Sequence, residues 1–232
     1  MIVDHTGLQV SAASQEAADA FDRTLVAYLR FGNDIGELLK TTYSLDSEMV
    51  FANVLRGYFM HMMGVRALVP KAQQALEAAQ RGASAATPRE QLHVNALEAW
   101  CALDLAGATA AWEECTRAYP MDVLAVKMLH YSHFYMGDSV NVRNSVGRVW
   151  HAWEGREDLP TYGYMLSMRA FGLEETGDYA RAESLGRAAA SLNEADAWAV
   201  HTVAHVCEME DRQTDGVAWL DSKGGYGNWN NF

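Results

Sequence analysis

The sequence predicts an all-α protein in which about six antiparallel helix pairs stack on one another. Three observations predict this fold: a helix-forming composition, recurring signals for helix starts and stops, and small residues that return at a repeat-like spacing. The 232 residues include only 4 Pro. Ala, Leu, Glu and Met are plentiful, whereas no segment alternates Val, Ile and Thr in the manner of a half-buried strand. Helices therefore have to carry the fold.

Capping residues mark the boundaries of individual helices. Thr87 places a hydroxyl at the N-cap, followed by Pro88 at the first helical position and Glu90 at the third, which together form a strong helix start. Asp122 is predicted to cap a later helix, and Gly137 suits the left-handed conformation that ends it.

Asp46 and Gly64 are predicted to bracket an earlier helix in the same way. Such signals divide the chain into short-looped helix pairs. The expected helices cover residues 14–30, 35–42, 47–63, 68–81, 88–103, 105–117, 122–136, 139–153, 161–176, 178–191, 195–210 and 212–221.

Small residues recur where the two helices of a pair would cross. Ala108, Val142 and Ala182 lie 34 and 40 residues apart, close to the period of tetratricopeptide repeats. Gly177 is placed to form the turn between the helices of one such pair. Because a helix pair cannot bury its apolar face alone, repeated pairs stack against one another. The pattern predicts a degenerate tetratricopeptide-like α-solenoid.

Several longer strings resemble one family. They are REQLHV at 89–94, PMDVLAVK at 120–127, the 130–137 stretch and, as the most specific, DAWAVHTVAHVCEM at 196–209. Together they are similar to the tetratricopeptide repeat protein 38 family, over about residues 14–229. The resemblance implies a cytoplasmic solenoid-like α fold and brings no activity with it. Family members continue into further helix pairs, so we expect either a short form or a fragment whose last pair exposes an apolar face.

Composition limits the partners and the compartment. The formal charge of −12, from 18 Lys and Arg against 30 Asp and Glu, disfavours nucleic acid and anionic membranes and favours cationic or neutral partners. The chain shows no signal peptide and no run of about 18 apolar residues, so we expect a cytoplasmic protein. Cys101, Cys115 and Cys207 are predicted to be reduced core thiols.

The predicted layout is an N-terminal segment (1–13), a helical repeat domain (14–221) and a Gly/Asn-rich tail (222–232). No cofactor is expected, since the sequence contains no nucleotide-binding glycine motif. Five tryptophans at helical spacing are expected to pack in the core, namely Trp100, Trp112, Trp150, Trp153 and Trp198. Trp219 and Trp229 are expected to be exposed or to pack on a missing segment.

His201, His205 and Glu208 lie one turn apart and share one helix face, within about 60° of arc. Two imidazoles and a carboxylate resemble a three-ligand zinc site that leaves a place for water. The His-Glu-x-x-His order is missing, however. We therefore favour polar packing for these residues and keep the metal site as a minor alternative.

Most of the histidines fall on the first helix of a predicted pair, and first helices line the concave side of tetratricopeptide arrays. The residues predicted to line such a groove are His93, His130, Tyr131, His133, Tyr135, Tyr164, His201 and His205. This distribution favours a module that binds a peptide segment or small ligand. His130 and His133 share a helix with two tyrosines, where a satisfied polar seam is the more common outcome.

Two other functions stay open. One is a hydrolase-type or metal-assisted enzyme that uses His201, His205 and Glu208 with His130 or His133 from a neighbouring first helix. The other is a structural role, in which the array is completed by another subunit as a homo-oligomer or lacks C-terminal repeats.

Overall fold

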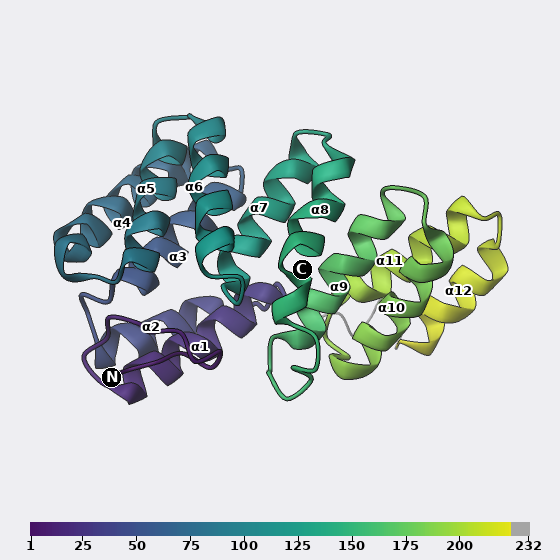
Figure 1. The fold of residues 1–232 in the computed structure, drawn as a ribbon, viewed down its shortest axis with the longest axis horizontal. Helices are drawn as coiled ribbons and strands as arrows, with labels where there is room; N and C mark the ends of the chain where they lie inside the picture. The colour runs from purple at the N-terminus through teal and green to yellow at the C-terminus, as the bar shows by residue number, and fades with distance from the viewer. Residues whose placement is uncertain (224–232) are drawn as a thin grey trace. The chain divides into compact units, whose positions relative to one another are not determined.

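Helices account for the regular structure of residues 1–223, the part of the chain that a computed structural model describes (Figure 1). Within this range twelve α-helices follow one another, and the one pairing of β type is an isolated bridge between Val3 and Gln9. Each predicted helix has a counterpart, so the all-α prediction is confirmed. Residues 224–232 of the predicted tail, Trp229 included, lie outside the described residues, whereas Ser222 is the last residue of a helix.

The chain divides into two compact units. Unit 1 contains residues 1–25 and 34–125, and unit 2 contains residues 26–33 and those from 126 onward. Two helices have residues in both units. They are α1 (Gln15–Leu29) and α7 (Val123–Tyr135). The eight residues 26–33 therefore belong with a unit whose remaining residues follow about a hundred positions later.

Unit 1 is built from successive antiparallel helices. They are α2 (Ile35–Leu45), α3 (Val50–Met62), α4 (Val69–Gly82), α5 (Pro88–Cys101) and α6 (Leu105–Ala118). Helix α4 packs against both α3 and α5, and α3 also contacts α5. A helix thus touches its partner and the first helix of the next pair, which is how helical repeats stack.

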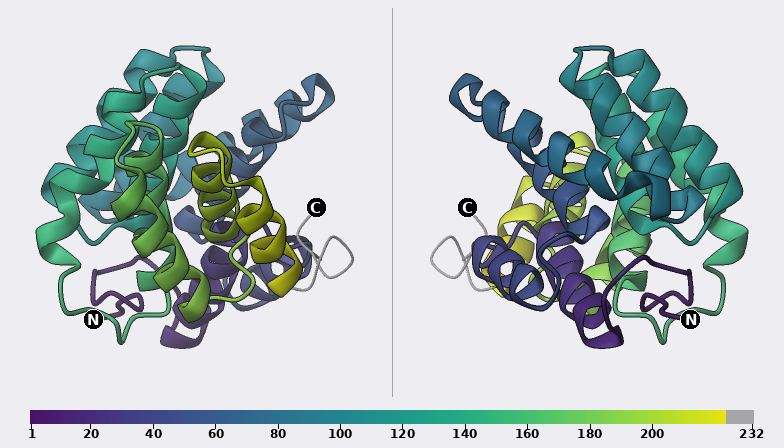
Figure 2. Two further views of the ribbon diagram at one scale, coloured as in Figure 1. Left: turned by 90° about the vertical axis from the view of Figure 1, so that its right-hand side faces the viewer. Right: turned by 90° about the vertical axis from the view of Figure 1, so that its left-hand side faces the viewer.

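Unit 2 repeats this packing pattern. Its helices are α8 (Ser139–Val149), α9 (Tyr162–Glu174), α10 (Tyr179–Leu192), α11 (Ala197–Met209) and α12 (Gln213–Ser222). Helix α10 packs against α9 and α11, and α9 contacts α11 directly. Figure 2 shows the yellow-green helices of this unit lying side by side. No described helix combines the length and apolar character that crossing a membrane requires.

The capping signals place most helix ends correctly. Thr87 accepts from the Glu90 amide while Glu90 accepts from the Thr87 amide, which confirms the predicted capping box. Asp122 Oδ1 accepts from the Ala125 amide at 2.8 Å. Gly137 has a φ of 72°, the left-handed conformation predicted for it, and Gly177, predicted to form a turn, has a φ of 80°.

The predicted helix start at Asp46 was wrong. Helix α3 begins at Val50, with Met49 at its N-cap. Asp46 instead closes α2, since its amide donates to the Thr42 carbonyl, and its carboxylate accepts from the amides of Glu48 and Ala13. A short acidic side chain caps a turn as readily as a helix, so the sequence signal was ambiguous here.

The predicted marker residues lie at the helix crossings. Ala108, Val142 and Ala182 are fully buried. Ala182 packs with Leu173 and Val206, which joins α10 to α9 and α11. The three cysteines are free thiols; Cys115 and Cys207 are buried, as predicted for core thiols, whereas Cys101 is only half-buried.

The tryptophans divide between core and half-buried positions. Trp112 and Trp153 are fully buried and Trp150 nearly so, which confirms the core prediction for these three, whereas Trp100 and Trp198 are only partly buried. Trp219 is half-buried against α11, where its indole N–H donates to the Val200 carbonyl at 3.0 Å.

Gly172 sets the approach of α9 to α8. A Cβ atom at this position would lie 2.6 Å from the Arg143 Cα atom, a backbone atom that cannot rotate away. Glycine is needed here because the two helix backbones touch.

We expect Gly172→Ala to lower the free energy of unfolding by about 1–3 kcal/mol, because α8 and α9 must separate. Gly147→Ala is the matched control, since Gly147 lies in α8 with no atom within 4 Å of the added Cβ. The control should be neutral or more stable by up to about 1 kcal/mol. Urea denaturation of both variants measures the difference, and equal stability of the two would contradict the close contact.

Candidate functional site

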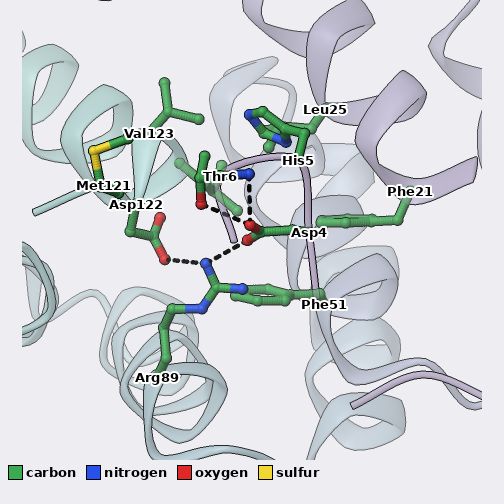
Figure 3. Close-up of a pocket in the computed structure, with 11 residues that line it drawn as sticks. Asp4, His5, Thr6, Phe21, Leu25, Phe51, Arg89, Met121, Asp122 and Val123 are labelled. Carbon is green, nitrogen blue, oxygen red and sulfur yellow. Dashed lines mark hydrogen bonds and ion pairs between the residues drawn. The ribbon is translucent and has the colours of Figure 1, made fainter. Parts of the chain in front are cut away.

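Arg89 forms a buried ion-pair network in unit 1 (Figure 3). Its guanidinium Nη1 lies 2.7 Å from Asp4 and 3.5 Å from Asp122, and the group stacks 4.7 Å from the Phe51 ring centre. Its Nη2 also donates to the Gln9 carbonyl. The N-terminal segment predicted at 1–13 is thereby fixed to α5.

His93 extends this network into the core. Its Nε2 lies 3.1 Å from Asp122 Oδ2, and its Nδ1 lies 3.1 Å from the Tyr58 hydroxyl, which accepts from the Trp112 indole N–H. Burial by itself raises the pKa of Asp122, but His93 and Arg89 hold that pKa well below its usual range. Asp122 therefore stays ionised, and His93 is a fully buried core residue that reaches no surface.

This network is built for stability. The potential ligand atoms of His93, Cys115 and Asp122 lie within 4.8 Å of one another. Burial, however, raises the pKa of the Cys115 thiol and keeps it protonated, and Arg89 already supplies a positive charge. The adjoining cavity has about 10 Å³, the size of a single water molecule.

We expect Arg89→Met to lower the free energy of unfolding by about 3–5 kcal/mol at pH 7, because two buried carboxylates lose their cation. Arg81→Met is the control, since the Arg81 side chain is 63% exposed and should matter by less than about 0.5 kcal/mol. Chemical denaturation of both variants gives the comparison. If Arg89→Met lowers the free energy of unfolding no more than Arg81→Met does, the result contradicts a stabilising network.

Lys127 is the buried cation of unit 2. It lies on α7, only 3% exposed, with its Nζ 4.2 Å from the Phe31 ring centre and 4.4 Å from that of Tyr131. Tyr28 forms a third wall, and the Leu29 carbonyl accepts from Nζ at 3.4 Å. Burial lowers the pKa of Lys127 to about 7.

Asp196 faces Lys127 from the start of α11. It caps this helix by accepting from the amides of Trp198 and Ala199. Burial raises the pKa of Asp196 to about 6, although these amides and Lys127 act in the opposite direction. The two charges act on each other through space, and Asp196 Oδ2 has no hydrogen-bond partner.

The sign of each shift sets the pH dependence of stability. The raised pKa of Asp196 makes stability fall as the pH rises through about 6. The lowered pKa of Lys127 makes stability rise from about pH 7 towards the value at which the unfolded side chain titrates. The charged pair therefore costs the fold most between pH 6 and 7.

We expect the double variant Lys127→Met/Asp196→Asn to exceed the parent in free energy of unfolding by about 1–4 kcal/mol near pH 6.5. Asparagine keeps the helix cap. The gain should shrink at both pH 4.5 and pH 9, which urea denaturation at the three pH values will detect. Lys40→Met, at an exposed lysine, should give no such maximum, and a flat difference for the double variant would contradict the buried pair.

A band of rings lies over Lys127. Its centre is Trp198 on α11, whose ring centre lies 5.4 Å from Tyr131, 5.1 Å from Phe171 and 5.0 Å from His201. We call this set the aromatic band, and it comprises Phe31, Tyr131, Phe134, Tyr135, Phe171, Trp198 and His201. The rings come from the end of α1 and from α7, α9 and α11.

The band is buried on one side and open on the other. Tyr131 and Phe171 are buried, whereas Phe31, Phe134 and Trp198 are half-buried. Tyr135 is 67% exposed, and His201 is also exposed. Aromatic side chains in such a half-exposed cluster are typical of binding surfaces.

The other residues predicted for a groove occupy varied positions. His130 is buried, with Nδ1 3.0 Å from the Val142 carbonyl, and burial lowers its pKa to about 3, so it stays neutral. His133 is also buried and lies 3.6 Å from Asp138. Tyr164 is buried in α9. His130 and His133, either of which the enzyme alternative adds to His201, His205 and Glu208, are thus both buried.

His201 and His205 stack on one another with ring centres 4.9 Å apart. The carboxylates grouped with His205 belong to Glu174 and Glu175 from the end of α9. Glu208, the third residue of the sequence pattern, is exposed on α11 and is not part of this group.

Sequence reasoning missed Lys127, Asp196 and Glu174 as members of a site. A signal existed for Lys127, because it is the one charged residue in the otherwise apolar or aromatic stretch VLAVKMLHY of α7. A lone cation that faces the core needs a partner. Nothing in the sequence pairs Glu174 with His205, since they lie on different helices.

A search against models of protein families finds no match to this chain, and no solved protein structure matches it. Over the described residues it is an all-helical protein whose adjacent helices pack in pairs.

Proposed function

We propose that this chain is a tetratricopeptide-like helical repeat protein that binds a peptide segment on the aromatic band of unit 2. The packing of α4 against α5, of α8 against α9 and of α10 against α11, each a second helix against the next first helix, supports the repeat architecture. The three first helices α7, α9 and α11 supply most of the band, in keeping with the side that such arrays use for binding.

The observation that carries this proposal is the partial exposure of the aromatic band. Seven rings in contact form a surface with Trp198 at its centre and Tyr135 at its edge. Tyr and Trp dominate binding hot spots because they offer a large apolar area with few rotatable bonds. Lys127 packs beneath Phe31 and Tyr131 and holds both rings in place, so a ligand meets a preformed surface.

Charge indicates the kind of peptide. The chain carries a net charge of −12, and near the band α11 presents the exposed Glu208. Ring faces attract Arg and Lys side chains through cation–π contacts. A segment with basic and apolar residues therefore fits better than an acidic one.

The free thiols support a reducing compartment, so we propose that the protein works in the cytoplasm.

We expect peptides selected on the purified chain from a random display library to be rich in Arg or Lys and in aromatic residues. Tyr135→Ala should weaken binding of a selected peptide about tenfold or more, because it removes an exposed ring at the edge of the surface. Val140→Ala is the control, since Val140 is 54% exposed on the second helix α8. Fluorescence anisotropy measures both affinities.

Two outcomes of this experiment would reject the proposal. One is the selection of no peptide above background. The other is a selected peptide whose affinity is unchanged by Tyr135→Ala and by His201→Ala, because binding would then lie elsewhere.

A further inference from the structure

The end of α9 and the middle of α11 bring two carboxylates and an imidazole together. Potential ligand atoms of Glu174, Glu175 and His205 all lie within 4.8 Å of one another. Glu174 is the last residue of α9 and Glu175 follows it. Direct packing of α9 against α11 fixes this juxtaposition within unit 2.

Glu174 is incompletely satisfied. The residue is only 4% exposed, and its Oε1 accepts from His205 Nδ1 at 3.0 Å. Its other oxygen, Oε2, is buried and has no hydrogen-bond partner in the structure. A buried carboxylate oxygen without a partner costs about 1–3 kcal/mol. A bound cation would satisfy it.

The local electrostatics favour a cation. The C-terminus of a helix carries a partial negative charge, which normally attracts Lys or Arg. The last turn of α9 has no basic residue and instead ends in two glutamates.

The His205 side of the cluster is accessible. The His205 side chain is 39% exposed, and His201 stacks on it one turn earlier in α11. An ion therefore has a path from solvent to the imidazole of His205.

We propose that Glu174, Glu175 and His205 bind a divalent transition-metal ion of the zinc type, with water in the fourth position. The imidazole favours zinc over calcium and magnesium, which prefer oxygen ligands. Zinc–ligand bonds of about 2.0–2.2 Å in a tetrahedron separate the ligand atoms by about 3.3 Å. The 3.0 Å between His205 Nδ1 and Glu174 Oε1 is close to such an edge.

The site is tested on the purified chain after treatment with a chelator. Isothermal titration with zinc chloride should show one ion bound per chain, and cobalt should give the visible absorption of a four-coordinate site. His205→Gln and Glu174→Gln should each weaken zinc binding by roughly a hundredfold or more, since the loss of a residue that only orients a metal ligand already costs about ten- to a hundredfold. Glu208→Gln is the matched control on the same helix and should bind like the parent.

Circular dichroism shows whether each variant is folded. If Glu174→Gln does not fold, the half-buried Glu175→Gln and the partly exposed His205→Gln carry the test. Absence of zinc binding by the parent chain would overturn the proposal, as would parent-like affinity in the folded Glu175→Gln and His205→Gln variants. Tighter binding of calcium than of zinc would overturn the metal class. Each of these outcomes is separate from peptide binding at Tyr135.

Discussion

Close approach of helix backbones is the constraint on which the rest of this structure depends. A helix in either unit has an apolar face that only a neighbouring helix can cover. Ala182 and Gly172 keep the crossings of α9 with its neighbours short because neither presents a bulky side chain. The positions of α9 and α11 then bring Glu174 beside His205. The chemistry of the candidate sites is a product of this packing.

Each unit also buries one cation, and the two are accommodated differently. Arg89 has a planar, permanently charged group that bonds two carboxylates at once, so unit 1 keeps a full ion-pair network in its core. Lys127 is surrounded by rings with one carboxylate nearby, and burial lowers its pKa to about 7, so it is only partly charged at neutral pH. The arginine network is suited to rigidity. The lysine supports rings that reach the surface, whereas the arginine network lies in the core of unit 1.

Local signals in the sequence predicted the helices well. Thr87 with Glu90, and Gly137 and Gly177 at helix ends, act through backbone atoms a few residues away, so their effect can be read directly. The helix start predicted at Asp46 was wrong because a short carboxylate caps a turn equally well.

Pairings between distant residues were not readable in this way. Asp4 meets Arg89, and Glu174 meets His205, only through the crossing of helices. The spacing of His201 and His205 identified a shared helix face correctly, as their stacked rings show. Periodicity on one helix cannot, however, name a partner on another, so Glu208 was grouped with them in place of Glu174.

Residues 26–33 complete unit 2 although they precede most of unit 1 in the chain. They contribute Tyr28, Leu29 and Phe31 to the enclosure of Lys127, which follows 98 residues after Leu29. During synthesis this segment leaves the ribosome long before the helices it covers. No single cut of the polypeptide can therefore release the two units as intact pieces, and a fragment that starts at residue 126 would leave the Lys127 ammonium group without Tyr28, Phe31 and the Leu29 carbonyl.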